Sequence, residues 1–174
     1  VSGALVHGGA LVGGLLQAVS HATAKAAMFM AAGLVYKAFG HDRIAELAGA
    51  ARALPLTVLT LAVSGVALMG VVPSGAYLAK KLLLAAADEG GQWWWALVLQ
   101  CGGALTCGYV VLVLVNVLRH ASEPATPKAP VPRLQEIAAL ALALCSLLLA
   151  FAAAEGGPVA SDLIKNPLAP DELL

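Results

Sequence analysis

The order of apolar and charged positions divides the chain into long uncharged stretches separated by short polar ones. Between Ser2 and Tyr36 the only formal charge is Lys25, and no charged residue occurs in 54–79, 90–118 or 137–154. A helix needs about 20 mostly apolar residues to cross a bilayer core of about 30 Å. The pattern therefore predicts helical spans near 11–39, 55–72, 76–89, 94–118 and 134–153.

These spans predict an all-α fold, a polytopic transmembrane helix bundle. The runs of Ala, Leu and Val lack the period-2 alternation of a membrane barrel, and in hydrocarbon the backbone must satisfy its own hydrogen bonds. The segment 76–89 is too short for an ordinary crossing, so we expect it to be a discontinuous helix. The segment GVVPSG (70–75) predicts a sharp turn, because Pro73 and Gly75 stop a helix and permit a reversal of the chain. The prediction is a membrane region over 1–154 and a polar C-terminal tail over 155–174.

Composition supports this interpretation and excludes several classes of protein. Of 174 residues, 60% are hydrophobic and 11% charged, whereas soluble domains carry about 25% charged residues. Ten basic and ten acidic residues cancel, so nothing in the charge points to nucleic acid. Cys101 and Cys107 have no neighbouring His or acid, and no nucleotide-binding glycine motif occurs. We therefore expect neither a metal nor a cofactor on this chain.

Orientation is left open by the basic loop residues. If the five predicted spans alternate, one side holds Lys37, Arg43, Arg52 and Lys165, and the other holds Arg119, Lys128 and Arg133. The positive-inside rule cannot choose between four and three. Three tryptophans, at 93–95, are typical of an aromatic belt at the membrane interface.

Lys25 is about fourteen residues from either end of its predicted span, where an ionised lysine costs about 2.5–3.5 kcal/mol. Gln17, His21 and Lys25 follow an i, i+4, i+8 spacing and so form one stripe, with neighbours about 6 Å apart along the axis. Burial moves a lysine toward releasing its proton, and histidine titrates near neutral pH. The stripe predicts a water-connected proton relay. The alternative is that these side chains only join helices through hydrogen bonds.

Lys80 and Lys81 lie near the middle of the short span and point about 100° apart on a helix. Short apolar segments beside Gly and Pro are typical of places where a transport pathway meets unwound backbone. We expect one lysine to face the bundle and the other a neighbouring helix or the lipid, unless both only snorkel from a half-helix. Glu136, at the start of the last span, is expected to be interfacial.

Two segments resemble a known family. The run from Ser20 to Gly33 (SHATAKAAMFMAAG) resembles the H-x-x-x-K-A-x-x-F-x-x-A-G motif of the antiporter-like subunits of respiratory complex I, Mrp cation/proton antiporters and membrane-bound hydrogenases. The segments 54–57 (LPLT) and 70–80 (GVVPSGAYLAK) resemble that family's M-P-L-T and G-x-P-P-x-S-G-F-x-x-K. Val72 replaces the second proline, and the aromatic residue is displaced to Tyr77.

The resemblance implies the C-terminal part of a longer subunit, without the family's first half-channel. It implies that His21 and Lys25 belong to the middle channel and that Lys80 is the terminal lysine, with Lys81 as a second candidate. Gln17 stands where the family commonly has a polar residue or a histidine; glutamine can orient water but cannot carry a proton. The resemblance also implies that the 119–133 loop is cytoplasmic.

We therefore expect a non-redox, proton-translocating subunit of a membrane complex of the NADH:quinone oxidoreductase type, in a bacterial inner membrane. Its expected partners are the lipid bilayer, further antiporter-like subunits and protons. Two alternatives stay open: a subunit of an Mrp-type sodium/proton antiporter, and a structural membrane subunit that does not pump.

Overall fold

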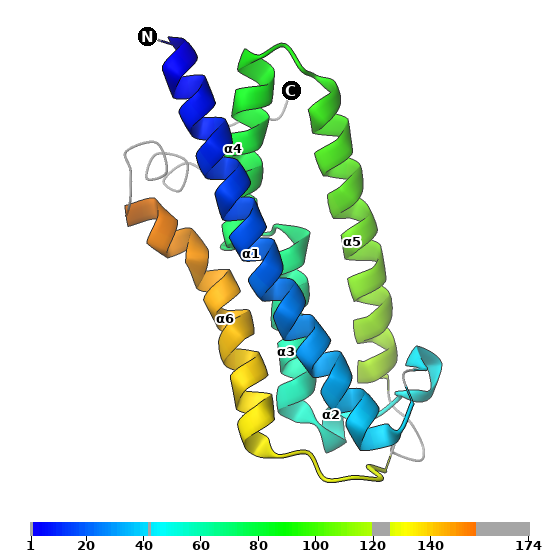
Figure 1. Cartoon of the computed structure of the whole chain (residues 1–174). Helices are drawn as coiled ribbons and strands as arrows, with labels where there is room; N and C mark the ends of the chain where they lie inside the picture. Colours follow the sequence, from blue (N-terminus) through cyan, green and yellow to red (C-terminus); the bar gives the residue numbers. More distant parts are fainter. Residues whose placement is uncertain (1, 42, 120–125, 156–174) are drawn as a thin grey trace.

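The computed structural model describes residues 2–41, 43–119 and 126–155, and all the regular structure of these residues is helical. The prediction of an all-helical membrane bundle is confirmed, since three helices are long and apolar enough to cross a bilayer and α3 is a shorter apolar helix. Residues 156–174 of the predicted tail lie outside the described part. The elements, drawn in Figure 1, are α1 (Ser2–Phe39), η1 (Ile44–Glu46), α2 (Ala50–Ala53), α3 (Pro55–Met69), α4 (Gly75–Glu89), α5 (Trp94–Leu118) and α6 (Arg133–Glu155).

The two short helices α3 and α4 follow each other end to end along α1 (Figure 1). Neighbours along α1 establish this order, because the number of the partner residue falls as the number on α1 rises. Gly13 lies against Leu82, Ser20 lies against Gly75, and Val35 belongs to the same buried cluster as Val58. A single helix that is antiparallel to both halves requires the halves to point the same way. Together α3 and α4 therefore make one discontinuous crossing.

The expected reversal of the chain at GVVPSG is wrong, and helix capping explains why. Gly70 ends α3 in the left-handed conformation, with φ of 68°, which glycine adopts without steric cost. Ser74 then begins α4, because its side chain accepts a hydrogen bond from the Tyr77 backbone N–H at 3.2 Å. The helix stops and restarts without changing direction.

A buried carboxylate fixes the first turn of α3. Oε2 of Glu136, on α6, accepts hydrogen bonds from the Thr57 backbone N–H at 3.2 Å and from the Thr57 hydroxyl at 2.9 Å. Leu54, at the N-cap, provides no side-chain acceptor, so Glu136 satisfies an otherwise unpaired donor of this turn from a different helix. Glu136 is 6% exposed. The expectation placed Glu136 at the membrane interface, and the structure adds that its carboxylate is buried between α6 and α3.

Very close helix contacts occur where side chains are small. A Cβ on Gly65 of α3 would lie 2.5 Å from Val110 Cγ1 on α5, and Val110 is fully buried. On the opposite side of the bundle, Ser146 of α6 donates to the Ser20 carbonyl of α1 at 2.9 Å. Small residues allow such approach between membrane helices.

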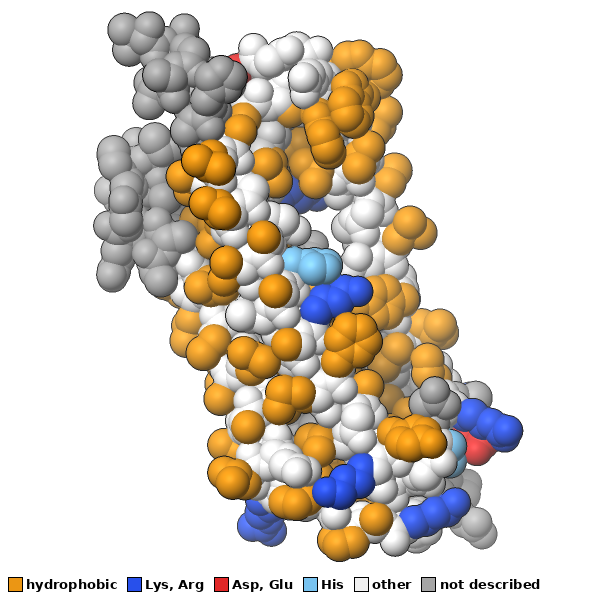
Figure 2. Space-filling view, in the orientation of Figure 1, with side chains coloured by type: hydrophobic (Ala, Val, Ile, Leu, Met, Phe, Trp, Pro, Cys, Tyr) orange, Lys and Arg blue, Asp and Glu red, His pale blue; other side chains and the backbone are white. Residues whose placement is uncertain are grey.

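Both basic loops lie at the same end of the bundle. The backbone N–H of Lys128 donates to the Ala38 carbonyl at 2.7 Å, and that of Gly49 donates to the Arg119 carbonyl at 3.0 Å. The assumption that these loops face opposite sides is wrong, because α3 and α4 form one crossing instead of two. The end where α1 finishes, at the bottom of Figures 1 and 2, carries Lys37, Arg43, Arg52, Arg119, Lys128 and Arg133.

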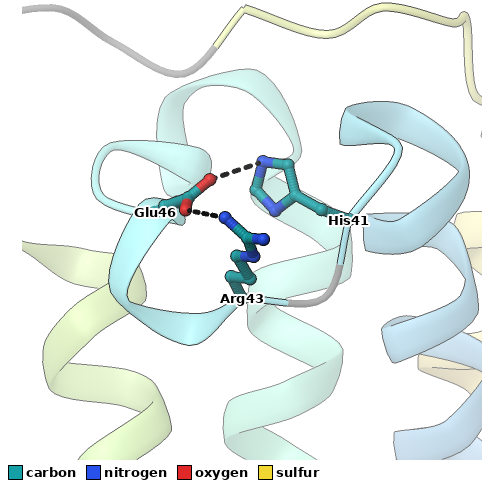
Figure 3. A network of polar contacts seen from close by, with 3 residues as sticks. All are labelled: His41, Arg43 and Glu46. Atoms are coloured by element: carbon teal, nitrogen blue, oxygen red, sulfur yellow. Dashed lines mark hydrogen bonds and ion pairs between the residues drawn. The ribbon is translucent and has the colours of Figure 1, made fainter.

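An exposed polar network orders the loop after α1 (Figure 3). Arg43 donates to Glu46 at 2.9 Å, and His41 Nε2 lies 3.7 Å from the other oxygen of that carboxylate. The hydrogen bond from Arg43 holds the pKa of Glu46 below its usual range. At the opposite end, α4 finishes with Asp88 and Glu89. The two ends of the bundle thus differ in charge.

Replacing Glu136 by alanine should loosen the start of α3. The buried Thr57 N–H and hydroxyl would lose their acceptor, which costs about 1–3 kcal/mol of folding free energy. The measurement is the temperature at which the chain dissociates from its detergent-solubilised native assembly. Gln135→Ala is the matched control, because Gln135 is its exposed neighbour and its side chain accepts a long hydrogen bond from Lys37, 3.4 Å. Equal shifts for the two variants would contradict the assigned role.

Gly65→Ala should destabilise the contact between α3 and α5. The added methyl group would overlap the buried Val110 side chain, and overpacking of this kind costs about 1–3 kcal/mol. Gly108→Ala on α5 is the control, since nothing lies within 4 Å of a Cβ there. In the same dissociation assay the control should behave as the wild type. A Gly65→Ala chain with unchanged dissociation temperature would show that the approach is looser than described.

Candidate functional site

The break between α3 and α4 leaves polar backbone groups halfway along the bundle. The last carbonyls of α3, including that of Met69, lack partners on a continuing helix, and the C-terminal end of a helix attracts cations. In membrane transport proteins such half-helix ends commonly bind ions or protons. The break therefore provides an electronegative backbone site at mid-depth.

Lys80 extends from α4 into this region. Its Nζ donates to Oε1 of Gln100, on α5, at 2.8 Å. A Cβ on Gly103 would lie 3.7 Å from Lys80 Nζ and 3.9 Å from the Met69 carbonyl oxygen. The ammonium group and the end of α3 thus border the same point, where α5 has no side chain to fill the space.

A cavity of about 220 Å³ brings residues of four helices together. It is bordered by Gln17 and His21 from α1, Met69 at the end of α3, Lys80 from α4, and Thr106 among other residues of α5. This volume is sufficient for several water molecules, each of which occupies about 30 Å³ in the liquid. Two residues of the predicted stripe on α1 and the predicted lysine of α4 therefore share one cavity, whose lining also includes apolar residues such as Leu68 and Val98.

Gln17 has a buried acceptor within this arrangement. Its Oε1 is shielded from solvent and has no hydrogen-bond donor among the described residues. Buried carbonyl oxygens are generally hydrogen-bonded, to protein or to ordered water. A water molecule in the cavity would provide that donor, which makes Gln17 a residue suited to orienting water.

A comparison of the sequence with known protein families gives this geometry a context. Residues 2–106, more than half of the chain, match the family model described as NADH:quinone oxidoreductase/Mrp antiporter, TM. The chain belongs to this family. No curated protein and no solved structure matches it.

The family match covers every predicted site residue of this antiporter-family chain, since α1, α3, α4 and the first half of α5 lie within it. The chain is thus an integral membrane protein of a family whose members work in multisubunit complexes. Its apolar outer surface, visible in Figure 2, is suited to contact with lipid and with other subunits.

Lys25 lies one helical turn beyond the cavity. Its Nζ is 5.8 Å from the centroid of the Phe29 ring, a distance at which a cation is attracted to an aromatic face. Lys25 does not border the cavity, but it follows His21 by four residues on the same face. The predicted stripe therefore divides: two members reach the cavity and the third lies beside it.

Lys81 has a different environment from Lys80. Its Nζ is 5.7 Å from the centroid of the Tyr77 ring, on the same helix, and Lys81 does not border the cavity. The spacing from Gly75 and the position of the cavity both favour Lys80 as the residue that faces the bundle.

Sequence reasoning missed Gln100 as part of the site. Gln100 is the first polar residue after the three tryptophans in an apolar run, and an isolated polar side chain in a membrane span is a usable signal. The role of the Met69 carbonyl depends on where α3 ends, and the sequence predicted that point only to within a few residues. No three His, Cys, Asp or Glu side chains in the described ranges come together as a metal site.

Proposed function

We propose that this chain forms the middle and terminal part of a proton pathway in an antiporter-like subunit. The observation that most directly supports this proposal is the cavity at the helix break, which Gln17, His21 and Lys80 all border. A lysine and a histidine that border one cavity large enough for several water molecules are groups that can exchange protons through that water. The family match supports the same assignment, because it covers all of these residues.

Each residue has a distinct role in this proposal. Lys25 holds a proton beside the cavity and passes it to His21, which lies about 6 Å away along the helix axis, a gap that one water can bridge. His21 transfers it through cavity water oriented by Gln17. Lys80 receives the proton and exchanges it with one aqueous side, while Gln100 and the end of α3 stabilise its charged form.

The proposed driving force comes from partner subunits. Redox chemistry in a complex of the NADH:quinone oxidoreductase type would change the protonation of the lysines by electrostatic coupling, and this chain would itself bind no redox group. The proposed location is a bacterial inner membrane. A sodium/proton exchanger of the Mrp type, driven by an ion gradient, would use the same residues.

We infer that the basic end of the bundle faces the cytoplasm. It carries both basic loops, whereas the opposite end carries Asp88 and Glu89. Cytoplasmic loops of membrane proteins are enriched in lysine and arginine. The described basic residues of both loops, which seemed to oppose each other, now add at one end.

Lys80→Ala should abolish the proton transport that passes through this chain. A positioned proton-transfer group contributes at least about 100-fold to a rate, so a fall of that size is expected. The measurement is acidification of membrane vesicles that contain the native assembly, followed with a pH-sensitive dye after energisation. Lys37→Ala is the control, because Lys37 lies at the end of α1, away from the cavity, and its side chain donates a long hydrogen bond to Gln135.

The Lys80→Arg variant tests whether position 80 must release a proton or must only carry a positive charge. Arginine keeps the positive charge and can still donate to Gln100, but it does not release its proton in proteins. The variant should assemble and fail to transport, so normal transport by Lys80→Arg would overturn the proposed role.

Transport that persists without a redox substrate and requires a sodium gradient would indicate the exchanger. Unchanged transport in both Lys80→Ala and Lys25→Ala would indicate a structural subunit.

A further inference from the structure

A second hollow lies between the cavity at the helix break and the acidic end of the bundle. It measures about 330 Å³ and is bordered by residues of α1, α4 and α5, together with Gln92. Gln92 belongs to the turn that joins α4 to α5 (Figure 1) and follows Glu89 by three residues. This hollow, which we call the outer hollow, therefore begins at the charged end of the bundle.

The outer hollow and the cavity at the helix break share one bordering residue among those that the structure describes, Leu99 of α5. Leu99 is half-buried and directly precedes Gln100, whose Oε1 accepts the hydrogen bond from Lys80. One helical turn before Leu99, the Trp95 indole N–H donates to Gln92 Oε1 at 2.9 Å. Leu99 therefore lies between the ammonium group and the polar residues of the acidic end.

The contact between α1 and α4 is closed at the same level. A Cβ on Gly13 of α1 would lie 3.0 Å from Leu82 Cβ and 3.3 Å from the Ala79 carbonyl oxygen, both on α4. A water molecule occupies about 30 Å³ in the liquid, and contacts this tight leave no such space. A water connection between the two hollows therefore runs on the α5 side of α4, past Leu99.

The outer hollow has space for water but few groups to hold it. Apart from Gln92 and the indole N–H that it binds, the described residues on its border present apolar side chains. Cavities with apolar walls commonly stay dry, and hydrophobic constrictions close channels by losing their water. From Lys80 to Glu89 the rise along α4 is about 14 Å, which is too far for a proton to pass without a chain of water molecules.

We propose that Leu99 is a hydrophobic gate between Lys80 and the aqueous phase at the acidic end. The inference rests on the proposed function, in which Lys80 exchanges its proton with one aqueous side, and it identifies the residue that controls this exchange. While the border at Leu99 is dry, a proton on Lys80 does not reach the acidic end. When water crosses the border, a continuous chain carries the proton there. The gate needs an apolar side chain, because a polar one would hold water at the border.

Cysteine labelling tests the gate without requiring proton transport. With the three native cysteines replaced by alanine, Gly103→Cys places a reporter thiol beside Lys80, where a Cβ makes only ordinary contacts. The measurement is the rate at which sulfonatoethyl methanethiosulfonate, which does not cross membranes and reacts with the thiolate, modifies this thiol from the acidic side of vesicles that contain the native assembly. Leu99→Ser should raise the rate at least about tenfold, which corresponds to a barrier lower by about 1.4 kcal/mol.

Two further variants are matched controls for this labelling. Leu97→Ser makes the same substitution on α5 at an exposed position that borders neither hollow. Leu99→Met keeps an apolar side chain of similar size at the border. Both should be labelled as slowly as the reporter chain with Leu99. Equal rates for Leu99 and Leu99→Ser, or an increase seen from the basic side alone, would overturn the gate.

Driven proton transport distinguishes failure of the gate from failure of the proposed function. In the native assembly, Leu99→Ser should lower the pH gradient that is sustained per turnover of the energising reaction, because protons from the acidic side then reach Lys80 at all times. Leu99→Met should restore the gradient. Faster labelling with an unchanged gradient would show a water gate on a path without protons and would overturn the proposed function. Slow labelling of Leu99→Ser together with lost transport in Lys80→Ala would overturn the gate alone.

Discussion

The antiparallel packing of one long helix against both halves of a broken one determines most of this structure. Because α1 continues through the level at which α3 stops and α4 begins, it holds the two halves in line and brings His21 to the break. Ser20 lies so close to Gly75, the first residue of α4, that a side chain at position 75 would crowd it. Without this contact, Lys80 and the stripe on α1 would have no common cavity.

Periodicity and charge were sufficient to predict the helices and most of the site. The uncharged runs predicted α1, α5 and α6, and the i, i+4 spacing placed Gln17 and His21 on one face. The direction of α4 was not predictable in this way, because Gly and Pro indicate that a helix ends without indicating where the chain goes next. The error in direction also made the basic loops seem divided between the two sides of the membrane.

Contacts between distant segments explain what else the sequence could not provide. Glu136 lies in the first turn of a span, a position where carboxylates commonly face water, and only the packing of α6 on α3 brings it to Thr57. Gln100 reaches Lys80 because α5 lies beside the break. The roles of His21, Lys25 and Lys80 in proton transfer stay predictions. Lys25 lies next to the cavity without bordering it.

The shared position of the two basic loops has a consequence for how the chain enters the membrane. In the proposed orientation, with the basic end in the cytoplasm, the turn between α4 and α5 is the connection between described helices that must pass through the lipid. It is four residues long, 90–93, and contains no charge, although Asp88 and Glu89 precede it. The broken helix and α5 can therefore insert together as a hairpin, so that the polar break reaches mid-bilayer with α5 already beside it.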